Sequence, residues 1–123
     1  MLRILCVDDD GLVLAVTADL IRTLGHDVVE AIGGDNGARA IDGDGPFDLL
    51  VTDVHMPGSL GGHDLADRAR IDRPEMPVIY FSGIDQVAQK RSGDRVLRKP
   101  CTLGELQQAI DDSAAAIRPA TPI

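Results

Sequence analysis

The chain has 123 residues, a length typical of one domain, and 44% of them are hydrophobic against 26% charged. This composition is that of a globular protein and not of a disordered one. The formal net charge of -8 at pH 7 argues against a nucleic acid or an anionic membrane surface as partner, because both require a basic face.

Five short apolar runs predict β-strands, because each is partly β-branched or aromatic and is bounded by Asp, Gly or Pro. Their continuous apolarity, without strict alternation of polar residues, is typical of parallel strands that are covered on both faces. In chain order, the predicted strands are residues 2–7, 28–32, 47–52, 78–81 and 96–97.

A helical pattern follows each run. The helix predicted over 12–24 has an apolar repeat at four-residue intervals, made of Leu12, Val16, Leu20 and Leu24. Gly25 is suited to end it. The later patterns cover residues 36–41, 65–72, 85–91 and 103–117. The pattern over 85–91 is weak, which predicts a short or loose fourth helix, whereas Thr102 and Glu105 fit a capping box that starts the last one.

The alternation of strand and helix predicts right-handed crossovers and a doubly wound α/β fold with one parallel sheet. One domain over residues 1–117 accounts for nearly all of the chain, and residues 118–123 are expected to form a flexible tail. In this architecture, ligands bind beyond the carboxyl ends of the strands. The residues at those ends are therefore the candidates for function.

Polar side chains follow four of the predicted strands. Asp8 and Asp9 follow the first strand, Asp53 the third, Ser82 the fourth and Lys99 the fifth. Carboxylates that lie close together need a cation, and an all-oxygen cluster suits a hard divalent ion such as Mg²⁺. Because a divalent ion and a lysine together neutralise a phosphoryl group, the pattern predicts a phosphoryl site in which an aspartate is the nucleophile.

Each of these residues has a plainer interpretation when it is taken alone. An Asp or Ser after a strand is usually a turn former, and a single lysine is usually a solvated charge. Asp10, directly before the predicted first helix, is expected to be only its N-terminal cap. The occurrence of all these residue types at four strand ends favours the functional interpretation.

Four motifs occur in order along the same strand–helix units. They are Val7-Asp8-Asp9, Thr52-Asp53-Val54-His55-Met56-Pro57-Gly58, Tyr80-Phe81-Ser82-Gly83 and Leu97-Arg98-Lys99-Pro100. With these motifs, the chain resembles the receiver domain of two-component response regulators over residues 2–117. The resemblance implies a flavodoxin-like (βα)5 three-layer sandwich with a five-stranded sheet of order 2-1-3-4-5.

The resemblance also implies roles for the acidic residues. Asp53 corresponds to the phosphoacceptor, and Asp9 and Asp53 correspond to ligands of Mg²⁺. Asp8 would help to hold the ion through a water molecule, and the backbone carbonyl of His55 would be a further ligand.

Two further residues acquire roles in the same way. Ser82 corresponds to the hydroxyl that moves to the phosphoryl group. Lys99 would pair with Asp53 and then with a phosphoryl oxygen, and its peptide bond to Pro100 would be cis.

The implied function is to accept a phosphoryl group from the phosphohistidine of a histidine kinase or a histidine phosphotransfer protein. Slow self-dephosphorylation would follow, and the signal would pass on by conformational change or onward phosphotransfer. Because the domain uses nearly the whole chain, no effector domain is expected within it. The loop over residues 56–62 is longer than the commonest receiver version and is similar to receivers that are fused to hybrid histidine kinases or stand beside them.

The chain departs from the common receiver pattern in three places. Val96 stands where many receivers have an aromatic residue three positions before the lysine, so a switch based on that ring is in doubt. Cys101 replaces an aromatic that often follows Lys-Pro, and the interval from Ser82 to Lys99 is short.

Two other functions use parts of the same residue pattern, and they are a phosphohydrolase and a binding module. A haloacid-dehalogenase-like phosphohydrolase would use Asp8 as its nucleophile, but it needs later acids at a strand end. The only later acids are in the last predicted helix, and they are Glu105, Asp111 and Asp112. A binding module that keeps the fold without phosphorylation is the other alternative. A dinucleotide site is excluded because no GxGxxG motif follows the first strand.

The remaining cysteines and histidines suggest no additional chemistry. Cys6 and Cys101 lack metal-binding spacing, and no apolar run is long enough for a signal peptide or a membrane span. We therefore expect a cytoplasmic protein with reduced thiols. His26 and His63 are expected at ordinary surface positions.

Overall fold

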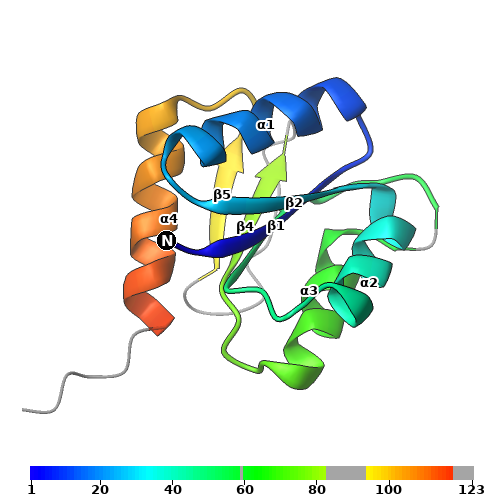
Figure 1. Cartoon of the computed structure of the whole chain (residues 1–123). Coiled ribbons are helices and arrows are strands. Elements are labelled where there is room, and N and C mark those ends of the chain that lie inside the picture. The colour runs from blue at the N-terminus through cyan, green and yellow to red at the C-terminus, as the bar shows by residue number, and fades with distance from the viewer. Residues whose placement is uncertain (59, 83–93, 118–123) are drawn as a thin grey trace, which may run out of the picture.

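The computed structural model describes residues 1–58, 60–82 and 94–117 of the chain. Five parallel strands form one sheet in the order β2-β1-β3-β4-β5 (Figure 1). The strands are β1 (Arg3–Asp8), β2 (Asp27–Ile32), β3 (Leu49–Asp53), β4 (Val78–Ser82) and β5 (Arg95–Arg98). The predicted fold class, the parallel pairing and the strand order are all confirmed.

Helices cover both faces of the sheet. They are α1 (Gly11–Thr23), α2 (Gly33–Gly43), α3 (Gly62–Asp72) and α4 (Leu103–Ile117). α1 and α4 pack on one face, and α2 and α3 pack on the other (Figure 1). The helix predicted over 85–91 and the tail over 118–123 lie outside the described residues.

The strands feed two separate cores because their side chains alternate between the faces. In β1, Ile4 and Cys6 join the core beneath α1 and α4, whereas Leu5 and Val7 join the core beneath α2 and α3. All four side chains are buried. The interior of a strand covered on both faces is therefore mostly apolar, whereas β2, at the edge of the sheet, also carries the exposed Glu30.

The ends of the helices follow the predicted caps. The Asp10 carboxylate accepts hydrogen bonds from the backbone N–H groups of Leu12 and Val13 at 2.9 and 3.2 Å, so Asp10 is the cap of α1. At the start of α4, Thr102 and Glu105 bond to each other's backbone N–H in a capping box. The helix predicted over 36–41 is longer than expected, because α2 begins directly after β2.

The apolar repeat that indicated α1 is only partly its buried face, because Leu20 and Leu24 pack against the core while the first two members do not. Leu12 and Val16, which begin the four-residue repeat, are 75% and 53% exposed. The buried apolar residues are instead Leu14, Ala18 and Ile21. The apolar residues of α1 therefore cover more of its surface than the sheet can bury, and Leu12 and Val16 are left at the surface.

Within the described ranges, no helix combines the length and the apolarity needed to cross a membrane.

α3 begins in tight contact with the end of β3. A Cβ atom added at Gly62 would lie 2.4 Å from the backbone oxygen of Asp53. This distance is far below an ordinary van der Waals contact, and the obstructing atom belongs to the backbone. The absence of a side chain at Gly62 therefore allows the first turn of α3 to pack directly behind Asp53.

Gly62→Ala is expected to lower the free energy of unfolding by about 1–3 kcal/mol, because the added methyl group must displace backbone. Urea denaturation measures the change. Gly43→Ala is the matched control at the end of another helix, where an added Cβ meets nothing within 4 Å. The control should be neutral or slightly stabilising. A Gly62→Ala protein as stable as the parent would contradict the packing argument.

Candidate functional site

The carboxyl ends of the parallel strands bring the predicted polar residues to one edge of the sheet. Asp8 is the last residue of β1, Asp53 of β3 and Ser82 of β4, and Lys99 directly follows β5. These strands are neighbours in the sheet, since β1 pairs with β3, β3 with β4, and β4 with β5. The predicted convergence at one edge is thus observed.

Three aspartates form the centre of this edge. Single carboxylate oxygens of Asp8, Asp9 and Asp53 all lie within 4.8 Å of one another. Asp8 is only 4% exposed, whereas Asp9 is exposed. Asp8 is held in place because one of its carboxylate oxygens accepts a hydrogen bond from the Asp10 N–H at 2.9 Å. The Asp10 side chain is engaged in capping α1 instead.

Lys99 bridges two of these carboxylates. Its Nζ lies 2.8 Å from Asp8 Oδ2 and 3.2 Å from Asp53 Oδ2. The pairing with Asp53 was expected, whereas the shorter one with Asp8 was missed. Asp8 and Lys99 are 91 residues apart, and nothing in the sequence indicates which of the nearby acids Lys99 contacts in the folded protein.

Backbone interactions position this lysine. The Lys99 N–H donates a hydrogen bond to the Ser82 carbonyl oxygen at 2.9 Å, which ties the residue after β5 to the end of β4. The peptide bond between Lys99 and Pro100 is cis, as the resemblance implied.

Burial and charge shift the ionisation of the two central groups. Burial raises the pKa of Asp53 above its ordinary value, the Lys99 charge lowers it, and the Asp8 charge adds to the increase. For Lys99, burial opposes the charged form, but the carboxylates of Asp8 and Asp53 outweigh it and raise the pKa of the ammonium. The lysine therefore remains a cation across the neutral range.

The charges at this edge are not balanced by the protein alone. One ammonium faces three carboxylates, which leaves a surplus of negative charge. The available ligand atoms are all carboxylate oxygens, the type that Mg²⁺ prefers, and nitrogen or sulfur ligands are lacking among the clustered residues that the structure describes. The donor set therefore fits a hard divalent cation.

Ser82 and His55 occupy the border of the cluster. Ser82 is 2% exposed at the end of β4. The His55 side chain is exposed, two residues after Asp53, which agrees with a residue that would contribute only its backbone carbonyl. Both assignments remain predictions.

His26 and His63 are not the ordinary surface positions that were predicted. His26 Nδ1 accepts a hydrogen bond from the Leu2 N–H at 3.1 Å, and burial lowers the pKa of its imidazole. The His63 ring lies 4.6 Å from the Tyr80 ring, centroid to centroid. His26 is half-buried beside the start of β1, and His63 is half-buried beside β4. The local sequence does not show that a loop or helix residue will pack next to a strand.

The exposed apolar residues Leu12 and Val16 of α1 border an apolar groove beside Lys99. The groove has a volume of about 410 Å³. Its walls come from α1, from the end of β4 and from the segment after β5, and its lining residues are Leu12, Val13, Val16, Thr17, Leu20, Phe81, Lys99, Pro100 and Cys101. Burial raises the pKa of the Cys101 thiol, and burial raises that of Cys6 to about 12. Both thiols are therefore protonated at neutral pH.

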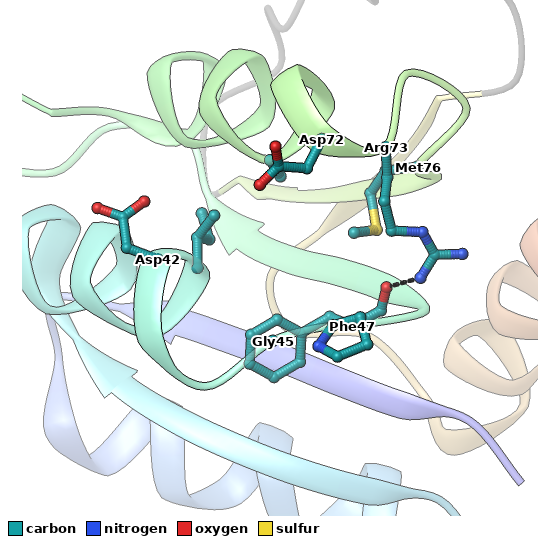
Figure 2. A pocket seen from close by; sticks show the side chains of 9 residues that line it. Asp42, Gly45, Phe47, Asp72, Arg73 and Met76 are labelled. Carbon is teal, nitrogen blue, oxygen red and sulfur yellow. Dashed lines mark hydrogen bonds between the residues drawn. The ribbon is translucent and has the colours of Figure 1, made fainter.

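A second cavity lies at the opposite edge of the sheet. Figure 2 shows this pocket of about 250 Å³ between the C-terminal ends of α2 and α3. The Arg73 guanidinium donates a hydrogen bond to the Phe47 carbonyl oxygen beside it. Because Phe47 precedes β3 and Asp53 ends it, this pocket is separate from the aspartate cluster.

Comparison with known proteins identifies the family. The model of the response regulator receiver domain matches residues 4–111. The transcriptional regulatory protein TcrA of Mycobacterium tuberculosis is 33% identical over 109 residues, which are 85% of this chain and 42% of TcrA. The chain thus spans less than half of this relative.

Solved structures agree. A response regulator receiver protein from Sinorhizobium medicae WSM419 has a TM-score of 0.84 at 25% identity and covers 93% of this chain and 94% of its own. The response regulator TrrA of Thermotoga maritima has the same fold, with a TM-score of 0.80 at 22% identity over 92% of this chain and 99% of its own. The chain belongs to the response regulator receiver domain family, a family of signalling domains.

Proposed function

We propose that this receiver accepts a phosphoryl group on Asp53 from the phosphohistidine of a histidine kinase or a histidine phosphotransfer protein. The observation that carries the proposal is the position of the Lys99 ammonium, 3.2 Å from the Asp53 carboxylate. Asp8 and Asp9 supply the other charged groups of the cluster. A nucleophile, a fixed cation and a set of oxygen ligands for a metal ion are thereby within reach of one phosphoryl group.

In the reaction, a carboxylate oxygen of Asp53 attacks the phosphorus atom in line with the bond to the donor imidazole. The P–N bond breaks, its electron pair stays on the histidine nitrogen, and Asp53 becomes an acyl phosphate. The Lys99 ammonium offsets the charge on the phosphoryl oxygens. The Ser82 hydroxyl donates a hydrogen bond to one of these oxygens in the phosphorylated state.

Asp8, Asp9 and Asp53 would hold Mg²⁺, with the His55 carbonyl as a further ligand. The ion would supply charge neutralisation for the transferring group. The surplus of negative charge in the cluster supports this assignment, and TrrA, which shares the fold, is described in complex with Mg²⁺-BeF. Water later hydrolyses the acyl phosphate and regenerates the Asp53 carboxylate, which limits the lifetime of the signal.

The alternatives find less support. A haloacid-dehalogenase-like mechanism needs an acid pair near the cluster, but Glu105 caps α4, and Asp112 of the same helix lies 4.0 Å from Arg95 of β5. A binding module without phosphorylation does not account for a lysine placed between two acids. It makes a distinct prediction, since such a module would not take up phosphate.

The apolar groove beside Lys99 supports a protein as the phosphoryl donor. Leu12 and Val16 are large apolar side chains left 75% and 53% exposed at its rim, and Lys99 lines the same groove. A donor that packs an apolar helix face here would bring its phosphohistidine toward Asp53. Acetyl phosphate, which makes no such contacts, would not depend on the groove.

Incubation with acetyl phosphate and Mg²⁺ should raise the intact mass by one phosphoryl group, and Asp53→Asn should abolish the gain because an amide is not a nucleophile here. The matched control is Asp35→Asn, an exposed acid in the first turn of α2 that should label normally. Stoichiometric labelling of the Asp53→Asn protein would place the acceptor elsewhere. An unlabelled parent protein would favour the binding module.

Mg²⁺ should stabilise the protein because it binds the folded cluster. At about 100 times its Kd, the ion should raise the free energy of unfolding by about 2.7 kcal/mol, measured by urea denaturation. Asp9→Asn should lose most of this increase. The neighbouring Asp10→Asn keeps an oxygen that can cap α1 and should retain it. An equal Mg²⁺ response in both variants would argue against the proposed ligand set.

Leu12→Asp should slow phosphotransfer from a phosphorylated histidine phosphotransfer protein at least several-fold while leaving labelling by acetyl phosphate unchanged. Ile71→Asp is the matched control, because Ile71 is 77% exposed on α3, away from the groove. Rapid-quench phosphotransfer assays compare the two variants. Equal rates for Leu12→Asp and Ile71→Asp would remove the groove from donor recognition.

A further inference from the structure

Tyr80 is a fully buried aromatic side chain next to the candidate site. It belongs to the core beneath α2 and α3, whereas its neighbour Phe81 belongs to the opposite core. Ser82 is two residues further along β4, so Ser82 and Tyr80 project toward the same face of the sheet. Because both residues belong to the same end of β4, a displacement of Ser82 toward a phosphoryl group would also move Tyr80.

The Tyr80 ring is in contact with the helix that begins behind Asp53. The ring centroids of Tyr80 and His63 are 4.6 Å apart, with an angle of 44° between the ring planes. His63 is the second residue of α3, directly after Gly62, which packs against the Asp53 backbone oxygen. The ring thus contacts the first turn of α3, one residue from the point where α3 touches the phosphoacceptor.

The Tyr80 phenol is near enough to the buried ion pair of Arg70 and Asp94 that both of these charges shift its pKa. Arg70 Nη2 of α3 lies 2.5 Å from Oδ1 of Asp94, the residue before β5, and the two side chains are 5% and 1% exposed. Arg70 Nε also donates to the Met76 carbonyl oxygen at 3.0 Å. The pair ties the C-terminal half of α3 to the start of β5, the strand that leads to Lys99.

The Tyr80 hydroxyl is buried and has no hydrogen-bond partner of good geometry among the residues that the structure describes, but it lies close enough to the Arg70 guanidinium for Arg70 to lower the pKa of the phenol. Burial, followed by the Asp94 charge, raises the pKa of this phenol to about 12, so it remains a neutral donor. A buried donor without an acceptor is unfavourable, and an arrangement in which it bonds to the adjacent carboxylate would be a competing state of similar energy. Val96, its register partner on β5, has a smaller side chain and no ring that could take over this role.

We infer that Tyr80 relays phosphorylation of Asp53 to α3 and β5, through its ring contact with His63 and through its hydroxyl beside the Arg70–Asp94 ion pair. The inference rests on the proposed function. Movement of the Ser82 hydroxyl to the phosphoryl group shifts this part of β4, the ring changes its contact with His63, and the hydroxyl gains a hydrogen bond to the Asp94 carboxylate of the ion pair. The surface affected is the outer face of α3 and the edge strand β5.

The chain provides its own reporter for the test, because Tyr80 is its one tyrosine and it has no tryptophan. Acetyl phosphate and Mg²⁺ should change the tyrosine emission intensity in proportion to the phosphorylated fraction, which intact mass measures separately. Asp53→Asn should show neither change. Full phosphorylation with unchanged emission would overturn the relay and leave the proposed function intact, whereas absence of any mass gain would overturn the proposed function.

Two substitutions distinguish the contribution of the Tyr80 ring from that of its hydroxyl. Phosphorylation should change amide hydrogen exchange in α3, and this change should be reduced in Tyr80→Phe and lost in Tyr80→Leu, although both proteins are phosphorylated. Phe81→Leu is the matched control, since it removes a neighbouring ring on the other face and should keep the α3 response. A parental α3 response in a phosphorylated Tyr80→Leu protein would overturn the inference. If Tyr80→Leu does not fold, Tyr80→Phe and the emission of the parent protein decide it.

Discussion

The burial of both faces of a parallel sheet constrains everything else in this molecule. The interior residues of β1, β3 and β4 are apolar or aromatic except for Thr52, because alternate side chains enter one core or the other. The charged residues of these strands therefore stand at the strand ends, and parallel strands place all their carboxyl ends on one edge. Asp8, Asp53 and Ser82 share that edge because each ends its strand. The chemistry of the site is thus a consequence of how the two cores are filled.

At this edge of the sheet, the balance between the aspartates and Lys99 determines what the site can bind. Lys99 offsets two of the acids but cannot neutralise the cluster of Asp8, Asp9 and Asp53, so the site retains an affinity for a further cation and for the group that a cation and a lysine together attract. The adjacent apolar groove has the opposite character. Under the proposed function, a protein donor would meet both, with the groove as contact area and the charged edge as the place of the reaction.

The sequence predicted the features that depend on local pattern. The five strands, the capping role of Asp10 and the polar strand ends follow from short-range chemistry, and the structure agrees. The apolar repeat of α1 indicated the helix but not which of its residues are buried, because only the position of the sheet determines that Leu14 and Ile21 pack while Leu12 and Val16 do not. The contact of Lys99 with Asp8 and that of His63 with Tyr80 depend on tertiary distances that no local pattern encodes.

The buried pair of Arg70 and Asp94 has a consequence for how this domain can vary. It fastens the start of β5 to α3, while the bond from the Lys99 N–H to the Ser82 carbonyl fastens the end of β5 to β4. The strand that leads to Lys99 is therefore anchored at both ends by residues outside 83–93. Deletions or insertions in that connection can accumulate without moving the lysine. A receiver with a short link between these strands can evolve new partner surfaces there while its phosphorylation chemistry is preserved.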